Sequence, residues 1–146
     1  MFVYPYPALW VRIKHRFGPR FMEWFIAWVT GCWGGVLLLP VQTFVAPQWV
    51  IFSAIGPEEW WGAIMLVLGI TRIGALIVNG TRKEITPWIR VVSAGCGFMI
   101  WVLITTSFAL TGVISTWLAI YPSLAFAEIV NVIRAARDVG ERNAVP

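Results

Sequence analysis

Two charged side chains lie deep inside apolar stretches of this sequence, and they are the residues best placed to do chemistry. Arg72 comes 12 residues after Trp60, and Glu128 comes 11 residues after Trp117, in segments that otherwise look like membrane spans. If both spans run in the same direction, the two charges reach nearly the same depth in the inner half of a bilayer. A carboxylate beside a guanidinium within a membrane could form part of an ion or proton path.

Two interpretations without chemistry compete with that path. An arginine in a span costs about 2.5 to 3.5 kcal/mol on insertion scales, and a pair with Glu128 would remove most of this cost and fix how two spans dock. Alternatively, the long side chain of Arg72 could reach the headgroups by itself. Asn79 and Asn131 lie near the same end and could extend a polar network. We favour the structural pair first, then the arginine at the headgroups, then the path.

Other reactive residue types are scarce. His15 is the only histidine, Asp138 is the only aspartate, and no lysine lies within an expected span. The two cysteines, Cys32 and Cys96, have no metal-ligand spacing. The sequence also lacks a Ser/His/Asp set, paired catalytic carboxylates and a phosphate loop. We therefore predict a protein that is not an enzyme and that uses neither a cofactor nor a metal.

The composition places these residues in a membrane protein. Of the 146 residues, 59% are hydrophobic and only 12% are charged, and the mean hydropathy is +0.77. Spans of about 20 residues cross a hydrocarbon core of about 30 Å. We predict an all-α integral membrane domain over residues 21–133 with four transmembrane helices in two hairpins. Their expected bounds are about 21–39, 60–78, 88–110 and 116–133, and residues 134–146 form a cytoplasmic tail.

The basic residues fall on one side of this arrangement. The connections between the first and second spans and between the third and fourth spans contain Glu58 and Glu59 and no basic residue. Only Arg72 lies within a span. Short basic loops stay cytoplasmic, so both termini are expected inside the cell, with the cations as anchors for anionic lipid headgroups. This topology also accounts for the net charge of +4, so no nucleic-acid partner is expected. The expected anchors are Arg12, Lys14, Arg16, Arg20, Arg82, Lys83, Arg90, Arg134 and Arg137, followed by Arg142.

Two further segments are expected to lie along the membrane surface. Residues 1–20 form a basic and aromatic segment, in which Leu9, Trp10, Ile13 and Phe17 fall at helical spacing. This pattern favours an interfacial amphipathic helix on the inner leaflet over a disordered tail. Residues 41–59 are too broken by proline to cross the membrane and are expected along the outer interface, with a short helix over 48–55. Interfacial tryptophan and tyrosine are expected at Trp60, Trp61, Trp117 and Tyr121 outside and at Trp88 inside, whereas Trp33 and Trp101 should face protein.

Small residues within the spans predict close helix packing. Gly31 and Gly35 have GxxxG spacing, and Ser93 and Gly97 are also four apart. The second span adds Gly62 and Gly69. Small faces let helices approach closely in lipid, either within one subunit or between copies of an oligomer, and the sequence does not separate these two uses. At the inner mouth of the first span, Glu23 is expected to form a surface ion pair with Arg20 or Arg90, worth under about 1 kcal/mol.

A longer pattern covers roughly the last 90 residues. It reads W-x(8)-G-x-x-R-x-x-A-L-x-x-N-G, a short basic turn, P-x-x-R-x-x-x-A-x-x-G-x-x-x-W, and finally R-A-A-R-D. The positions are Trp60, Gly69, Arg72, Ala75, Leu76, Asn79, Gly80, Pro87, Arg90, Ala94, Gly97, Trp101, Arg134, Ala135, Ala136, Arg137 and Asp138. This pattern resembles small multi-span membrane proteins of tailed bacteriophages, often described as holin-like. The resemblance implies a phage origin and a place in the bacterial inner membrane.

Three functions follow as expectations. The first is a holin-like protein that oligomerises in the bacterial inner membrane and permeabilises it, although four spans exceed the number in common holin classes. The second is a non-catalytic structural or accessory subunit of a larger membrane or virion-associated assembly. The third, which we rank lowest, is a small ion- or proton-coupled transporter.

Overall fold

The computed structural model describes residues 17–18, 20–78, 85–112 and 114–143, without the side chains of 141–143. Within these ranges the regular structure is entirely helical. Three helices are long and apolar enough to cross a membrane: α4 (Glu58–Val78), α5 (Thr86–Leu110) and the Trp117–Gly140 part of α6 (Trp117–Asn143). The predicted all-α membrane class is therefore confirmed at this level.

The first predicted span corresponds to α2 (Phe21–Leu37), which is apolar but only 17 residues long. At 1.5 Å of rise per residue, α2 extends about 26 Å, slightly less than a typical hydrocarbon core. The fourth predicted span forms the first part of α6. This helix continues without a break to Asn143, so most of the expected tail is helical. The expected interfacial helix within residues 1–20 lies almost entirely outside the described residues, as do Arg12, Lys14, Arg16, Asn79, Arg82 and Lys83.

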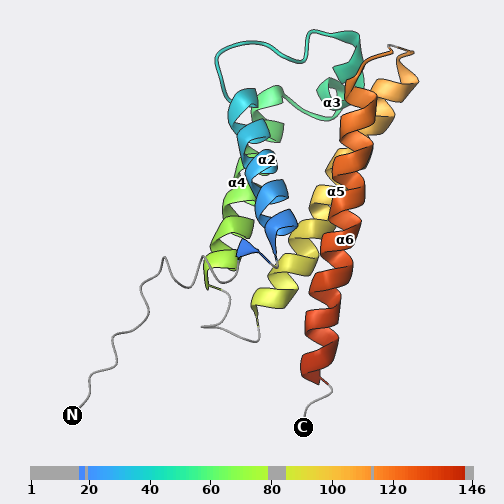
Figure 1. Ribbon diagram of the computed structural model, residues 1–146. Helices are drawn as coiled ribbons and strands as arrows, with labels where there is room; N and C mark the ends of the chain where they lie inside the picture. The colour runs from blue at the N-terminus through green and yellow to red at the C-terminus, as the bar shows by residue number, and fades with distance from the viewer. Residues whose placement is uncertain (1–16, 19, 79–84, 113, 144–146) are drawn as a thin grey trace, which may run out of the picture.

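The helices form two antiparallel pairs (Figure 1). α2 packs along α4, and α5 packs along α6; the pairs meet mainly through α4 with α5 and α2 with α6. At one end of the bundle, α2 and α5 begin and α4 and α6 end; because Arg20, Arg90, Arg134 and Arg137 lie there, we call it the basic end. At the other end lie η1 (Pro47–Trp49) and α3 (Val50–Ile55), and we call it the α3 end.

The connection between α2 and α4 folds into the α3 end of the bundle. The carboxylate of Glu58 accepts hydrogen bonds from the backbone N–H groups of Thr43 (2.8 Å) and Phe44 (2.9 Å), which ties the connection to the first turn of α4. Trp49 and Phe52 are buried, and Trp61 Nε1 donates to the carbonyl of Phe52 at 3.2 Å. The short helix expected over residues 48–55 is present, as η1 and α3, but its aromatic side chains pack into the protein.

The largest buried side chains near the α3 end form one group, which we call the aromatic cluster: Trp49, Phe52, Trp101, Phe108 and Tyr121. Phe108 joins the connection to α6, since its ring centroid lies 5.0 Å from that of Trp49 and 5.1 Å from that of Tyr121. Tyr121 was expected at the outer interface, but its ring is buried against Trp101. Edge-to-face and offset contacts of this kind add to the stability gained from burying the rings.

Candidate functional site

Arg72 and Glu128 meet in the interior, as their matched depth predicts. Arg72 Nη2 donates to Glu128 Oε2 at 2.7 Å, and Nη1 donates to Oε1, so the guanidinium binds the carboxylate through two parallel hydrogen bonds. Arg72 is 4% exposed and Glu128 is fully buried. The alternative in which Arg72 extends to the headgroups is therefore wrong. A buried carboxylate with this bidentate partner is stabilised by the geometry that arginine supplies best.

The helices around this pair are shaped to fit it. A Cβ atom on Gly97 would collide with Glu128 Oε1 and would lie 3.2 Å from Arg72 Nη1, so only glycine leaves room for the pair. One turn along α6, Asn131 Nδ2 donates to Glu128 Oε2 at 3.2 Å. Arg72, Glu128 and Asn131 form what we call the deep cluster. The sequence grouped Gly97 with helix packing, and its specific neighbour is this carboxylate.

A second group of charges, which we call the basic-end cluster, consists of Glu23, Arg90, Asp138 and Arg20. Arg90 donates from Nε and Nη2 to the two oxygens of Glu23, both at 2.6 Å, and from Nη1 to Asp138 at 2.6 Å. Arg20 Nη2 lies 3.2 Å from the same oxygen of Asp138. The cluster therefore connects α2, α5 and α6 at one level.

This cluster corrects two expectations. Glu23 was expected to pair with Arg20 or Arg90 at the surface, and Arg90 to lie at the headgroups; Glu23 does bind Arg90, but the two residues are 5% and 4% exposed, so the pair is buried. Sequence reasoning missed Asp138 because it treated the end of α6 as a solvated tail. A usable signal is the spacing, since Glu128, Asn131, Ala135 and Asp138 recur every three or four residues and share one helical face. The remaining described anchors, Arg134 and Arg137, are exposed.

The charges within each cluster balance. The deep cluster contains one cation and one anion, and the basic-end cluster contains two of each. Among the described residues, no group of three His, Cys, Asp or Glu side chains is placed to hold a metal ion. What the arrangement does is hold four helices in register, because each buried charge has its partner on another helix.

The small residues of α2 and α4 are used within the chain. A Cβ atom on Gly69 would lie 2.6 Å from the Cα of Gly31, and one on Gly62 would lie 2.9 Å from Leu38 Cγ. Gly34, rather than Gly35, completes the seam: a Cβ there would lie 2.7 Å from the carbonyl oxygen of Gly62, whereas Gly35 has no atom within 4 Å. The sequence therefore predicted the wrong second glycine: Gly34 packs against α4, and Gly35 does not. Ser93 is buried and donates to the carbonyl of Arg90.

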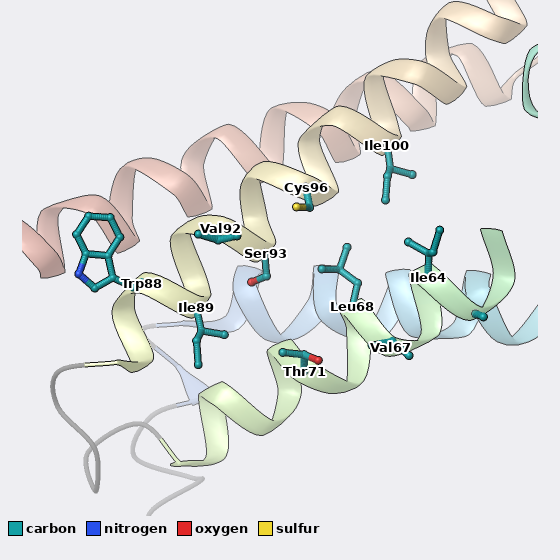
Figure 2. A pocket seen from close by; sticks show the side chains of 11 residues that line it. Ile64, Val67, Leu68, Thr71, Trp88, Ile89, Val92, Ser93, Cys96 and Ile100 are labelled. Atoms are coloured by element: carbon teal, nitrogen blue, oxygen red, sulfur yellow. The ribbon is translucent and has the colours of Figure 1, made fainter. Parts of the chain in front are cut away.

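An apolar groove of about 720 Å³ runs along the bundle between α4 and α5. Figure 2 shows Ile64, Leu68 and Thr71 of α4 beside Ile89, Cys96 and Ile100 of α5 at this groove. The groove exists because α4 and α5 belong to different pairs and pack together less closely than the helices within each pair. It is a lateral surface of the bundle, and neither the deep cluster nor the basic-end cluster contributes a lining residue to it.

These features define a class: the chain is a multi-pass, all-helical membrane protein whose interior is organised around buried ion pairs. No protein-family model matches the sequence, and neither a curated protein nor a solved structure matches it.

Proposed function

We propose that this chain is a holin-like membrane protein that assembles with copies of itself in the bacterial inner membrane and permeabilises it. The observation that carries the proposal is the contrast between a closed interior and an open lateral groove. The aromatic cluster fills the bundle near the α3 end, and the deep cluster fills it further down. A path across the membrane must then form between subunits, and the α4–α5 groove offers an apolar surface for that contact.

The proposal includes four spans with both termini inside. α2 supports this count because its contacts cover the depth of the bundle: Glu23 binds Arg90 at the basic end, and Leu38, just after α2, reaches Gly62 near the α3 end. The basic end is assigned to the cytoplasm by the charge rule for short loops. In a Cys32→Ser, Cys96→Ser background, Val45→Cys should react with an impermeant thiol reagent in intact cells, and Arg137→Cys only after the cells are opened. The reverse labelling pattern would contradict this orientation.

The two natural cysteines test where copies meet. Both are exposed, but Cys96 lines the groove, whereas Cys32 lies on α2 and is not among the groove-lining residues. Mild oxidation of membranes should therefore give disulfide-linked dimers through Cys96. The Cys96→Ser variant should lose the dimer, and the Cys32→Ser variant should keep it. Dimers that require Cys32 instead would place the contact on another face.

Permeabilisation itself is tested by inducing the chain alone in a bacterium and following membrane potential with a dye. We expect depolarisation with the natural sequence and a loss of this effect with Cys96→Phe, which fills the groove. Met99→Phe is the matched control, because Met99 is an exposed residue of α5 outside the groove-lining set. If the natural chain accumulates in the membrane without any depolarisation, the holin-like function is wrong.

The alternative is a non-catalytic structural or accessory subunit of a larger membrane or virion-associated assembly. The specific observation in its favour is that the close-packing glycines Gly31, Gly34, Gly62 and Gly69 are occupied within the subunit. The free groove could then receive a helix of a different protein. Purification from the native source separates the two: a fixed ratio with other proteins supports the accessory role, and a homo-oligomer supports the first proposal. The third expected function, an ion- or proton-coupled transporter, depends on the carboxylate of Glu128. A Glu128→Gln variant that keeps all activity of the natural chain would exclude it.

A further inference from the structure

A small polar cavity separates the deep cluster from the basic-end cluster. Its volume is about 10 Å³, close to the ~10–15 Å³ that one water molecule needs. The lining comes from α2, α4, α5 and α6 and includes Glu23, Arg72, Arg90, Ser93 and Asn131. Most of this lining is charged or can form hydrogen bonds, unlike the apolar cavities that stay dry in protein interiors.

Asn131 supplies an independent observation at this cavity. The residue is 1% exposed, and its Oδ1 accepts no hydrogen bond in the described structure. Its Nδ2 donates to Glu128, so a flipped amide would place Oδ1 against the carboxylate oxygen, where both atoms are acceptors. The amide orientation is thus set by chemistry. A buried acceptor without a donor is destabilising, and a donor within the cavity would remove that cost.

We propose that this cavity binds one exchangeable water molecule, which donates to Asn131 Oδ1 and hydrates the Arg72–Glu128 pair from the basic end only. Water fits better than an ion because the charges of both clusters already cancel, so a bare ion would add a buried charge without a partner. The route is one-sided because the side chains of Asp138 and Arg20 at the basic end are 32% and 25% exposed. Towards the α3 end, Trp101, Phe108 and Tyr121 are buried.

The direct test is magnetisation transfer from water to labelled side-chain nitrogens, measured by solid-state nuclear magnetic resonance in bilayers. Transfer is expected at the Asn131 amide and the Arg72 guanidinium. The indole N–H of Trp101 is the internal control: like Asn131 Oδ1 it is buried without a hydrogen-bond partner in the described structure, but Trp101 does not line this cavity. Transfer to Asn131 and Arg72 as weak as that to Trp101 would overturn the proposal. Strong transfer to Trp101 would show that water also enters from the α3 end.

A substitution then assigns the signal to this cavity. Ala94 lines the cavity and is buried, so Ala94→Val should fill the space and reduce transfer at Asn131 to the level of Trp101. Ala109→Val makes the same change at an exposed position of the same helix and should leave the transfer unchanged. Unchanged transfer in a folded Ala94→Val protein would contradict the site. If that variant does not fold, the comparison of Asn131 with Trp101 in the natural chain still decides.

Discussion

The two halves of this bundle are held together by different chemistry. In the half nearer the basic end, the contacts that join helices are directional: Arg72 with Glu128, and Arg90 with Glu23 and Asp138. In the half nearer the α3 end, the contacts are mainly between rings, and hydrogen bonds of Glu58 and Trp61 hold the α2–α4 connection. Lipid tails are as apolar as leucine, so helices in a membrane gain little from hydrophobic burial against each other. The comparison teaches that charged pairs fix the register of α2 and α4 against α5 and α6, while the rings close the bundle over the α3 end and hydrogen bonds to Glu58 hold the α2–α4 connection.

The largest effect is expected from breaking the deep pair on one side. Arg72→Leu leaves Glu128 without its cation in a fully buried site, and removing one partner of a buried pair costs about 3–5 kcal/mol. We expect a loss of this size in the free energy of unfolding, measured by denaturant titration in bicelles. The double change Arg72→Met, Glu128→Leu should recover much of the loss, because neither charge remains. A double variant as unstable as the single one would contradict the pairing account.

A comparable but smaller loss is expected from the other half. Phe52→Ala removes a fully buried ring from the aromatic cluster, and we expect a cost of about 3 kcal/mol, at the lower end of values for such truncations. Its combination with Arg72→Leu should be additive within about 0.5 kcal/mol, because distant sites without shared partners act independently. Strong non-additivity in the same titration would mean that the two halves do not act as separate units.

Gly97→Ala sharpens the comparison with a single methyl group. The added carbon would collide with Glu128, so the helices must shift, and overpacking of this kind costs about 1–3 kcal/mol. Gly95→Ala is the matched control, since no atom lies within 4 Å of the corresponding position two residues earlier. We expect a lower unfolding midpoint for the first variant and no decrease for the second. Equal midpoints would show that the fit around the deep pair is loose.

The sequence predicted more of the deep cluster than of its surroundings, for a physical reason. Arg72 and Glu128 stand out because charge is rare in apolar segments and depth can be counted along a helix. Arg90 was expected as a possible partner of Glu23, but its burial and the contribution of Asp138 were missed, because both residues lie near span ends, where charges are common and a solvated position is the usual expectation. Spacing alone could not decide whether Gly34 or Gly35 packs against α4, since both belong to a run of small residues. Only the position of the partner helix decides which of the two makes the contact.

The fold was predictable to a similar extent. Hydropathy located α4 and α5 to within about two residues, because apolar length follows from the thickness of the membrane. The inward turn of Tyr121 and the burial of Trp49 were not predictable, since interfacial and buried aromatics share the same composition. Whether such a ring is buried or interfacial depends on whether the α2–α4 connection folds over the end of the bundle. The hydrogen bonds from the backbone of Thr43 and Phe44 to Glu58 hold the connection there.

The smallest effect is expected at the outermost charge of the basic half. Asp138→Asn removes one anion from Arg90, but Glu23 still binds that guanidinium through two hydrogen bonds, and the Asp138 side chain is 32% exposed. Partly exposed ion pairs contribute about 0.2–1 kcal/mol, so the unfolding free energy should fall by no more than this and by less at high salt. Glu23→Gln is the control within the same cluster and should cost more, because it leaves the buried Arg90 with its more exposed partner alone. If Asp138→Asn proved the more damaging of the two, the end of α6 rather than the mouth of α2 would be the main support of Arg90. The contribution of the charges to the free energy of unfolding would then not decrease from the deep pair outward.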